Sequence, residues 1–189
     1  MVPNHTVFGL IALGESMQRR PRSPAAFAAA VCLIAITAAP RAAQASATVV
    51  AFAGYAAGTI VVKTNERRLY LVVDAQHALR YPVGVGRAGK QWQGTSHIDG
   101  KYLKPAWSPP ADVKRDKPFL PEVIPGGTPQ NPMGVAAMTL SGTEYAIHGT
   151  NMPGSVGGFV SYGCIRMYNQ DITDLFDRVS VGTTVVVTR

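Results

Sequence analysis

Thr59-Ile60-Val61-Val62-Lys63 and Leu69-Tyr70-Leu71-Val72-Val73 decide the fold, together with a third run over residues 79–85. All three runs are short and rich in β-branched and aromatic residues, which favour strands. Asn65-Glu66-Arg67 separates the first two runs, and Asp74-Ala75-Gln76 follows the second. Both clusters are typical of tight turns. The stretch 59–85 therefore predicts an antiparallel meander of three strands.

The same pattern continues outward to the end of the chain. Further runs of β-type residues occupy residues 95–103, 135–140, 144–147 and 183–188. Residues 169–179 differ, because their apolar side chains recur every three or four positions, at Ile172, Leu175, Phe176 and Val179. That spacing predicts an amphipathic helix. The expected fold class is mainly β with one short helix.

Residues 105–132 interrupt the run of strands. They hold eight prolines and the pair Gly126-Gly127, too many for a central strand and too irregular for a helix. Long insertions of this kind in compact domains are usually functional lids or linkers. We expect an ordered flap that covers the catalytic stretch; the alternative is a stiff surface loop without a role in catalysis.

The first 47 residues form an N-terminal extension and a secretory signal. Arg19, Arg20 and Arg22 precede an apolar run over residues 25–39, and Ala45-Ser46-Ala47 ends a stretch of small residues. This layout predicts cleavage after Ala47, with an uncleaved membrane anchor as the alternative. The predicted catalytic domain is then residues 48–189, located in the periplasm or cell wall.

Composition supports one globular domain and argues against a nucleic-acid partner. The chain has 189 residues, of which 47% are hydrophobic and 15% charged, with a net charge of +7. Residues 48–189 carry 14 Lys and Arg against 10 Asp and Glu, a net charge of +4. No dense basic block with interleaved aromatic residues occurs. A weakly basic surface suits an anionic cell envelope.

Cysteine usage points to a reactive thiol. Cys32 lies in the predicted signal, so Cys164 is the single cysteine of the mature part and cannot form an internal disulfide. His148 lies 16 residues before it. A neighbouring imidazole lowers the pKa of a thiol and accepts its proton, which makes the pair a candidate nucleophile and base. The amides of Gly163 and Cys164 are candidates for an oxyanion hole.

Several other interpretations of these residues stay open. A lone Cys is often a small core residue, and a lone His on a strand is often a satisfied core side chain. A zinc site built from His77, His97, His148 and Cys164 lacks paired ligand spacing. A serine hydrolase based on Ser155 or Ser161 lacks the Gly-x-Ser-x-Gly elbow.

The motif itself resembles a known family. His148-Gly149-Thr150-Asn151, followed by Ser161-Tyr162-Gly163-Cys164-Ile165-Arg166-Met167, is similar to the catalytic motif of the L,D-transpeptidase (YkuD-like) family. The similarity covers most of residues 58–189. It implies a β-sandwich of two packed mixed sheets, with one short helix after the catalytic loop. It also implies a cysteine acyltransferase that acts on peptidoglycan tetrapeptide stems without a metal or organic cofactor.

The resemblance also implies residue roles. Cys164 is the nucleophile that forms a thioester and releases the terminal D-alanine, His148 is its base, and the Gly149 carbonyl orients the imidazole. The implied substrate-binding residues are Arg166, Asn151, Tyr162 and Ser161. For Arg166 the alternative is a structural ion pair with Asp171. Three positions depart from commoner members, which often have His at Tyr162 and Arg at Ala136 and Ala146; the missing arginines put the acyl-donor contacts in doubt.

The acyl acceptor is not fixed by these residues. A second stem peptide gives 3→3 crosslinks, whereas water, a free D-amino acid or an envelope protein gives carboxypeptidase, exchange or anchoring activity. Carbapenem-type β-lactams are expected inhibitors, and we expect a monomer. The alternatives from other classes are a non-catalytic peptidoglycan-binding module and a sortase-like protein transpeptidase.

Overall fold

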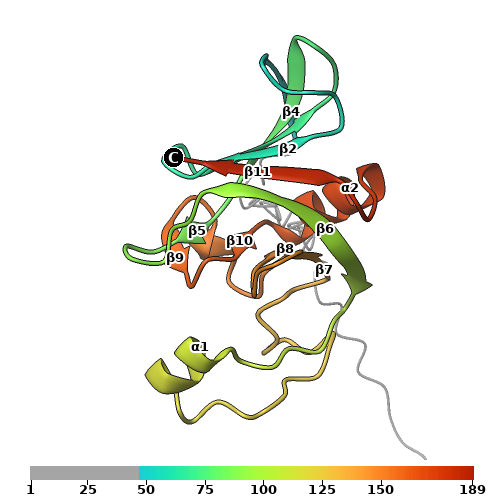
Figure 1. Ribbon diagram of the computed structural model, residues 1–189. Helices are drawn as coiled ribbons and strands as arrows, with labels where there is room; N and C mark the ends of the chain where they lie inside the picture. Colours follow the sequence, from blue (N-terminus) through green and yellow to red (C-terminus); the bar gives the residue numbers. More distant parts are fainter. Residues whose placement is uncertain (1–46) are drawn as a thin grey trace, which may run out of the picture. The chain divides into compact units, whose positions relative to one another are not determined.

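The computed structural model describes residues 47–189 (Figure 1). Most of the predicted export signal, including Cys32, lies outside these residues. In chain order the described elements are β1 (Thr48–Ala51), β2 (Ile60–Lys63), β3 (Arg68–Val72), β4 (His77–Pro82), β5 (Val85–Gly86), β6 (Gly94–Leu103), α1 (Ala111–Asp116), β7 (Ala136–Leu140), β8 (Ala146–His148), a 3-10 turn (Pro153–Ser155), β9 (Phe159–Ser161), β10 (Ile165–Arg166), α2 (Asn169–Arg178) and β11 (Thr184–Thr188). Neither described helix is long and apolar enough to cross a membrane.

The meander expected over residues 59–85 is present as β2, β3 and β4. These strands pair antiparallel, with Ile60 opposite Leu71 and Leu71 opposite Leu79. β1 adds to the outer edge of β4, and β11 closes the other side by pairing parallel to β2. Buried apolar side chains fix the register of these strands, since a slip of one residue would turn them to solvent.

A single long strand joins this half of the fold to the other. β6 pairs with β11 through its first residues and with β7 through its last, and its register shifts between Ile98 and Gly100. The hydrogen-bonded order is β1-β4-β3-β2-β11-β6-β7-β8-β10. Figure 1 shows β2 and β11 on one side of β6, and β7, β8 and β10 on the other. The two halves are thus continuous at β6 and fold over each other.

One hydrophobic core fills the space between the halves. It includes Ile60 and Leu69 from the meander and Met138 and Ile147 from β7 and β8, all fully buried. The helix predicted over residues 169–179 is α2, and its periodic apolar face (Ile172, Leu175) packs into the same core. The predicted fold class is confirmed: mainly β, with mixed pairing and a helix after the catalytic loop.

The structure differs from the prediction in several segments. The flap contains a helix, α1, which the proline count had excluded; the prolines flank it at Pro109-Pro110 and Pro118, so six residues between them are free to coil. The run over 79–85 is broken at Val83-Gly84 into β4 and β5. β9 and β10 were missed because two or three residues are too few to show a strand period.

Truncating the core tests this packing. We predict that Leu69→Ala lowers the free energy of unfolding by roughly 2–5 kcal/mol, because it removes a fully buried side chain from the shared core. Leu103→Ala is the control, since Leu103 is 70% exposed, and it should change stability by no more than about 0.5 kcal/mol. Urea titration measures both; equal losses would contradict the described core.

Candidate active site

The parallel pairing of β8 with β10 brings His148 and Cys164 to the same edge. Ile165 lies opposite Ile147, and Arg166 opposite His148. Cys164 immediately precedes β10, and His148 is the last residue of β8. Neighbouring strands lie about 4.8 Å apart. Residues 16 positions apart in sequence are thus held side by side by backbone hydrogen bonds, including Met167 N–H to the His148 carbonyl at 2.8 Å.

The imidazole of His148 is buried and fixed in one tautomer. Its Nδ1 lies 2.6 Å from the Gly149 carbonyl oxygen. A carbonyl can only accept, so Nδ1 carries the hydrogen and Nε2 keeps a lone pair. The contact is the one that the family resemblance implied for Gly149. Its geometry leaves Nε2 as the basic atom of the ring.

Burial determines the resting charges of the pair. Burial, and then the positive charge of Arg166, lower the pKa of His148 to about 4, against the opposing effect of the Gly149 carbonyl. Burial also raises the pKa of the Cys164 thiol, while the Ala146 backbone and Arg166 act in the other direction. At neutral pH the pair is therefore a thiol and a neutral imidazole. The expectation of a lowered thiol pKa is wrong for this resting state.

The turn that carries the thiol is braced from within. Gly163 N–H donates to Ser161 Oγ at 3.1 Å, and the Ser161 hydroxyl donates to the Cys164 carbonyl at 2.6 Å. Trp92 Nε1–H donates to the Gly163 carbonyl at 3.0 Å. Gly163 has φ +130°, and a Cβ there would lie 2.2 Å from a ring atom of Tyr145. Only glycine fits this position.

These contacts correct two predicted roles. The Gly163 amide is occupied by Ser161, so it is not a free oxyanion donor, and of the predicted pair the Cys164 amide is left. The Ser161 hydroxyl both donates and accepts within the turn, and the residue is 1% exposed. Ser161 therefore shapes the turn, and its hydroxyl is already used there as both donor and acceptor.

The thiol and the imidazole line one small cavity of about 60 Å³. Arg166, Tyr162 and Ser161 line it from the same side. Its opposite wall comes from the flap and is made of Trp107, Pro110, Val113, Pro132 and Met133. The segment over residues 105–132 therefore lies against the nucleophile, as a lid would.

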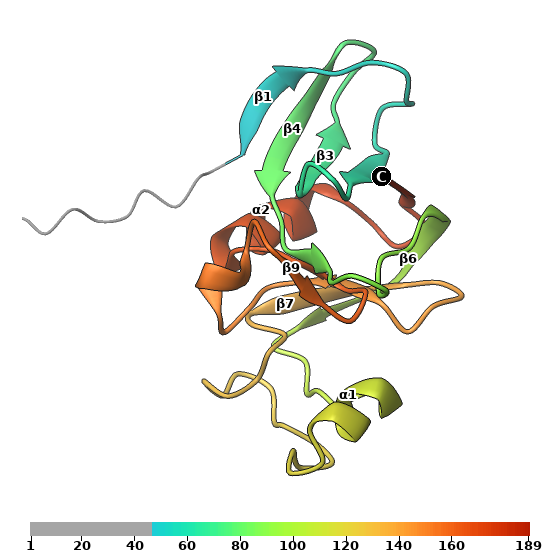
Figure 2. The same ribbon diagram turned by 90° about the vertical axis from the view of Figure 1, so that its left-hand side faces the viewer.

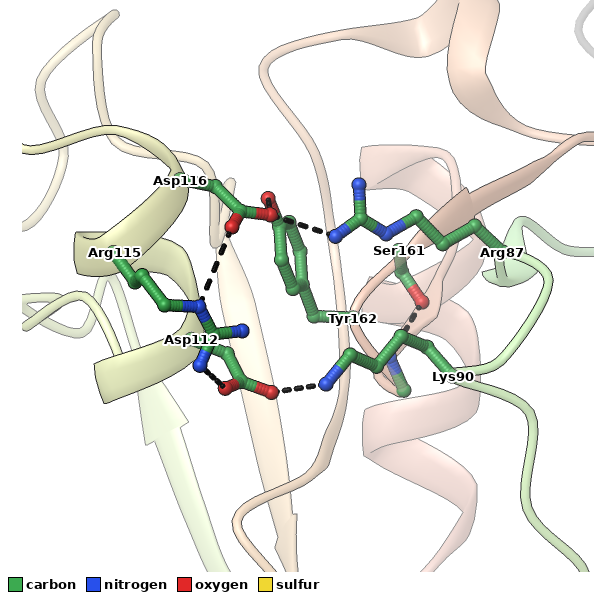
Figure 3. A network of polar contacts seen from close by, with 8 residues as sticks. Arg87, Lys90, Asp112, Arg115, Asp116, Ser161 and Tyr162 are labelled. Carbon is green, nitrogen blue, oxygen red and sulfur yellow. Dashed lines mark hydrogen bonds and ion pairs between the residues drawn. The ribbon is translucent and has the colours of Figure 1, made fainter.

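Charged side chains hold the flap in this position (Figure 3). Asp116 of α1 accepts hydrogen bonds from the Tyr162 hydroxyl and from Arg87, each at 2.7 Å. Asp112, one turn earlier, pairs with Lys90 and with Arg115. The Arg87 guanidinium lies 4.1 Å from the centre of the Tyr162 ring. We call Arg87, Lys90, Asp112, Asp116 and Tyr162 the latch, because they tie α1 to the loop after β5 and to the catalytic turn.

Arg166 is partly buried beside the thiol and has no side-chain partner within residues 47–189. The alternative ion pair with Asp171 is therefore wrong: neither residue forms a salt bridge among the described side chains. An unpaired guanidinium that lines the cavity is available to a carboxylate.

Asn151 is not part of this cavity. Its side chain donates to the Pro129 carbonyl at 3.1 Å, and it lines a separate cavity of about 440 Å³ together with Lys104 and Asn169. The predicted contact between Asn151 and a substrate at Cys164 is therefore not supported.

The zinc and serine interpretations find no support in the geometry. No three His, Cys, Asp or Glu side chains within residues 47–189 gather closely enough to hold a metal. Ser155 donates to the Met152 carbonyl at 2.6 Å, which stabilises its own turn.

Comparison with known proteins shows the family to which the chain belongs. The family model described as the L,D-transpeptidase catalytic domain, YkuD, matches residues 57–187. The chain is 40% identical over 137 residues to the probable L,D-transpeptidase ErfK/SrfK of Escherichia coli K12, which covers 68% of this chain and 43% of that protein. The chain thus spans less than half the length of that relative.

Two solved structures share the fold. L,D-transpeptidase 3 from Mycobacterium tuberculosis, in complex with a faropenem-derived adduct, superposes with a TM-score of 0.54 and 14% identity over 69% of this chain and 60% of that one. A Brucella melitensis chain described as a probable carnitine operon oxidoreductase has a TM-score of 0.52 and 39% identity over 77% of this chain and 94% of that one.

Because the Brucella melitensis chain is described as an oxidoreductase, we checked the sequence for a dinucleotide-binding glycine pattern. Gly84, Gly86 and Gly89 have the spacing of a dinucleotide-binding fingerprint, which requires a helix directly after the glycines to receive a pyrophosphate. Here β5 pairs with β9, and the chain continues into β6 without a helix. The spacing is coincidental in this fold.

The role of Arg166 can be tested by titration. Because its positive charge stabilises the thiolate and disfavours the imidazolium, Arg166→Gln should raise the pKa of Cys164 further and raise that of His148. The rate of iodoacetamide alkylation against pH reports the thiol, and a shift of about half a unit or more is expected. Arg80→Gln, an exposed arginine on β4, is the control; identical profiles for all three proteins would contradict this electrostatic role.

The latch predicts a faster-reacting thiol when it is weakened. Asp116→Asn removes the charge that holds Arg87, so the flap should open more often and a thiol reagent should react roughly two- to fivefold faster. Asp177→Asn, an exposed acid of α2, should leave the rate unchanged. Reaction with a bulky maleimide at fixed pH measures the effect, and an unchanged rate in Asp116→Asn would refute the latch.

Proposed function

Because the chain belongs to the YkuD family of L,D-transpeptidase catalytic domains, we propose that it is a secreted cysteine L,D-transpeptidase that acts on peptidoglycan tetrapeptide stems through a thioester on Cys164. The observation that carries this proposal is the cavity shared by the Cys164 thiol and the neutral, tautomer-fixed imidazole of His148. Such a pair is suited to acyl transfer by a sulfur nucleophile.

The first half-reaction forms the acyl-enzyme. Nε2 of His148 takes the thiol proton while Sγ of Cys164 attacks the carbonyl carbon of the third stem residue. The bond to the terminal D-alanine then breaks, and the leaving amine takes the proton back from the imidazolium. A thioester and free D-alanine result. We assign the Cys164 N–H as a backbone donor to the developing oxyanion.

The second half-reaction transfers the acyl group. An amine of a second stem attacks the thioester carbon, His148 accepts a proton from that amine, and the thiol leaves with a proton returned by the imidazolium. The product is a 3→3 crosslink. Water, a D-amino acid or a lysine of an envelope protein would enter by the same step, because each supplies a nucleophilic oxygen or nitrogen that can lose a proton to His148.

The neutral resting state suits this mechanism. The partly buried Cys164 has a raised pKa and stays a thiol until a base takes its proton, and His148 with a pKa of about 4 stays unprotonated over the physiological range. Proton transfer then accompanies attack rather than preceding it. The positive charge of Arg166 stabilises the transient thiolate of Cys164.

Substrate binding requires the flap to move. A cavity of about 60 Å³ holds a few atoms, not a peptide. Displacement of α1 would open the cavity and free the Tyr162 hydroxyl from Asp116. Arg166 would then meet a carboxylate of the anionic stem peptide. Tyr162 and Arg166 are thus the substrate-binding residues that the geometry favours.

Location and inhibition follow from the same proposal. The predicted signal places the domain in the periplasm or cell wall, where peptidoglycan is found. Carbapenem-type β-lactams are proposed to acylate Cys164; the adduct in the Mycobacterium tuberculosis structure of the same fold derives from faropenem, a β-lactam of the related penem class, and supports this proposal.

Muropeptide analysis tests the reaction. We predict that residues 48–189, incubated with disaccharide tetrapeptide, release D-alanine and form a 3→3 dimer, and that Cys164→Ala does neither. Cys32 lies outside residues 48–189, so Cys164 is the one thiol in the protein used for this experiment. Release of D-alanine without a dimer would indicate that the acyl acceptor is water or a protein rather than a second stem peptide. Absence of both products would favour a non-catalytic peptidoglycan-binding module.

A further inference from the structure

A second polar cavity, of about 420 Å³, shares no lining residue with the cavity of Cys164. Ala47 and Leu79 line one side, and the α2 residues Gln170, Asp171, Asp174 and Arg178 line the other. Figure 2 shows the start of β1 and the end of β4 on the side of the molecule where α2 lies. The cavity thus lies between the first described residues and the helix that follows the catalytic strand.

Asp171 is the unusual residue of this cavity. It is 2% exposed, and its carboxylate accepts no hydrogen bond and forms no ion pair within residues 47–189. Buried polar atoms are almost always paired, because an unpaired carboxylate loses its hydration without compensation. Burial, and then the charge of Asp174, raise the pKa of Asp171 to about 6. The mechanism proposed above does not use this group.

The other charged groups around Asp171 are already paired. Asp174 accepts from the Tyr81 hydroxyl at 2.6 Å and from Arg178 at 2.8 Å. The Arg178 guanidinium pairs with Asp174, which lies one helical turn before it in α2, and not with Asp171. Two carboxylates and one guanidinium leave the cavity one positive charge short of neutrality. A cation is the complementary ligand.

The chain itself contains a source of that cation. Ala47 lines the cavity and packs against the core, and Thr48 is the first residue of β1, held opposite Arg80 of β4. The predicted cleavage site is the Ala47–Thr48 bond. Hydrolysis of this amide by water would leave a carboxylate on the departing leader and an ammonium on the nitrogen of Thr48. The new charge would arise at the wall that Ala47 forms.

We propose that the cavity is a binding site for a primary ammonium group, occupied in the mature protein by the α-ammonium of Thr48, which pairs with Asp171. The proposal rests on cleavage after Ala47 and not on the chemistry of Cys164. Removal of the leader would then add an ion pair between β1 and α2. Since α2 packs against β7 and β8, processing would stabilise the support of His148.

The pH dependence follows with its sign. In the uncleaved chain the folded pKa of Asp171 is raised, so stability falls as the pH rises from about 4 to about 6, and the full cost of the buried charge is present above that range. In the mature chain the ammonium would lower that pKa and have its own raised, so the pair stabilises the fold between the two values. The difference between the chains should be greatest near pH 7 and should disappear in acid, once Asp171 is protonated in both. Asp174, Arg178 and Tyr81 are common to both chains.

The experiment compares a chain that begins at Thr48 with one that retains Ser46-Ala47, each with Asp171 or with Asp171→Asn. The buried members of both core clusters lie within residues 60–187, so the two chains differ in core packing only by Ala47, which is partly buried against the first cluster. At pH 7 the chain beginning at Thr48 should melt roughly 3 °C or more above the extended chain. Asp171→Asn should abolish that difference, and Asp177→Asn, an exposed acid on the same helix, should preserve it.

Two further readouts exclude a merely structural effect of the substitution. NMR titration should place the pKa of the Thr48 α-ammonium about one unit or more above its usual range of about 7.7–8.0, and in Asp171→Asn it should return to that range. Methylammonium at tens of millimolar should not stabilise the Thr48 chain, because its cavity is filled. Equal melting temperatures with a normal ammonium pKa would overturn the proposal, and equal stabilisation of both chains by methylammonium would assign the site to an external amine instead. Neither result depends on catalytic activity.

Discussion

The pairing of β8 with β10 is the constraint on which the rest of the structure depends. It sets His148 opposite Arg166 and places the Cys164 thiol at the start of the adjacent strand. A slip of one residue would turn one of these side chains to the opposite face. The fold supports this register from both sides: β7 pairs with β8, and α2 buries Ile172 and Leu175 in the core beside them. Cys164 is therefore positioned by a sheet and lies in the turn before β10.

The same burial that fixes the site also favours the uncharged forms of its two titratable side chains. Desolvation favours the neutral forms of both Cys164 and His148, and the flap leaves only a small cavity above them. The latch holds the flap with exposed ion pairs, which are weak individually. Because the latch is weak, we expect substrate to displace the flap. The bound substrate would then meet the uncharged Cys164 and His148 side chains. Arg166, unpaired beside the thiol, is the one cation already in place.

Much of this could be predicted from the sequence. Residue type and period found β2, β3, β6, β7, β11 and α2, because each buries a regular apolar pattern, and the motif around His148 and Cys164 indicated the family. What failed depended on tertiary contacts. The capture of the Gly163 amide by Ser161, the placement of Asn151 in another cavity and the unpaired Asp171 all arise from side chains that meet only after folding. The flap helix was not predicted because prolines flank it on both sides. The acyl acceptor could not be predicted because the same Cys and His residues serve every acceptor.

The central claim is that Cys164 carries the stem peptide as a thioester, and trapping that species tests it most directly. Residues 48–189 are mixed with disaccharide tetrapeptide, quenched in acid within seconds and measured as intact protein. The account predicts an adduct with the mass of the stem less its terminal D-alanine, located on the Cys164 peptide, absent in Cys164→Ala and removed by hydroxylamine. An unmodified Cys164 in a preparation that nevertheless releases D-alanine would contradict the account, because the nucleophile would then lie elsewhere.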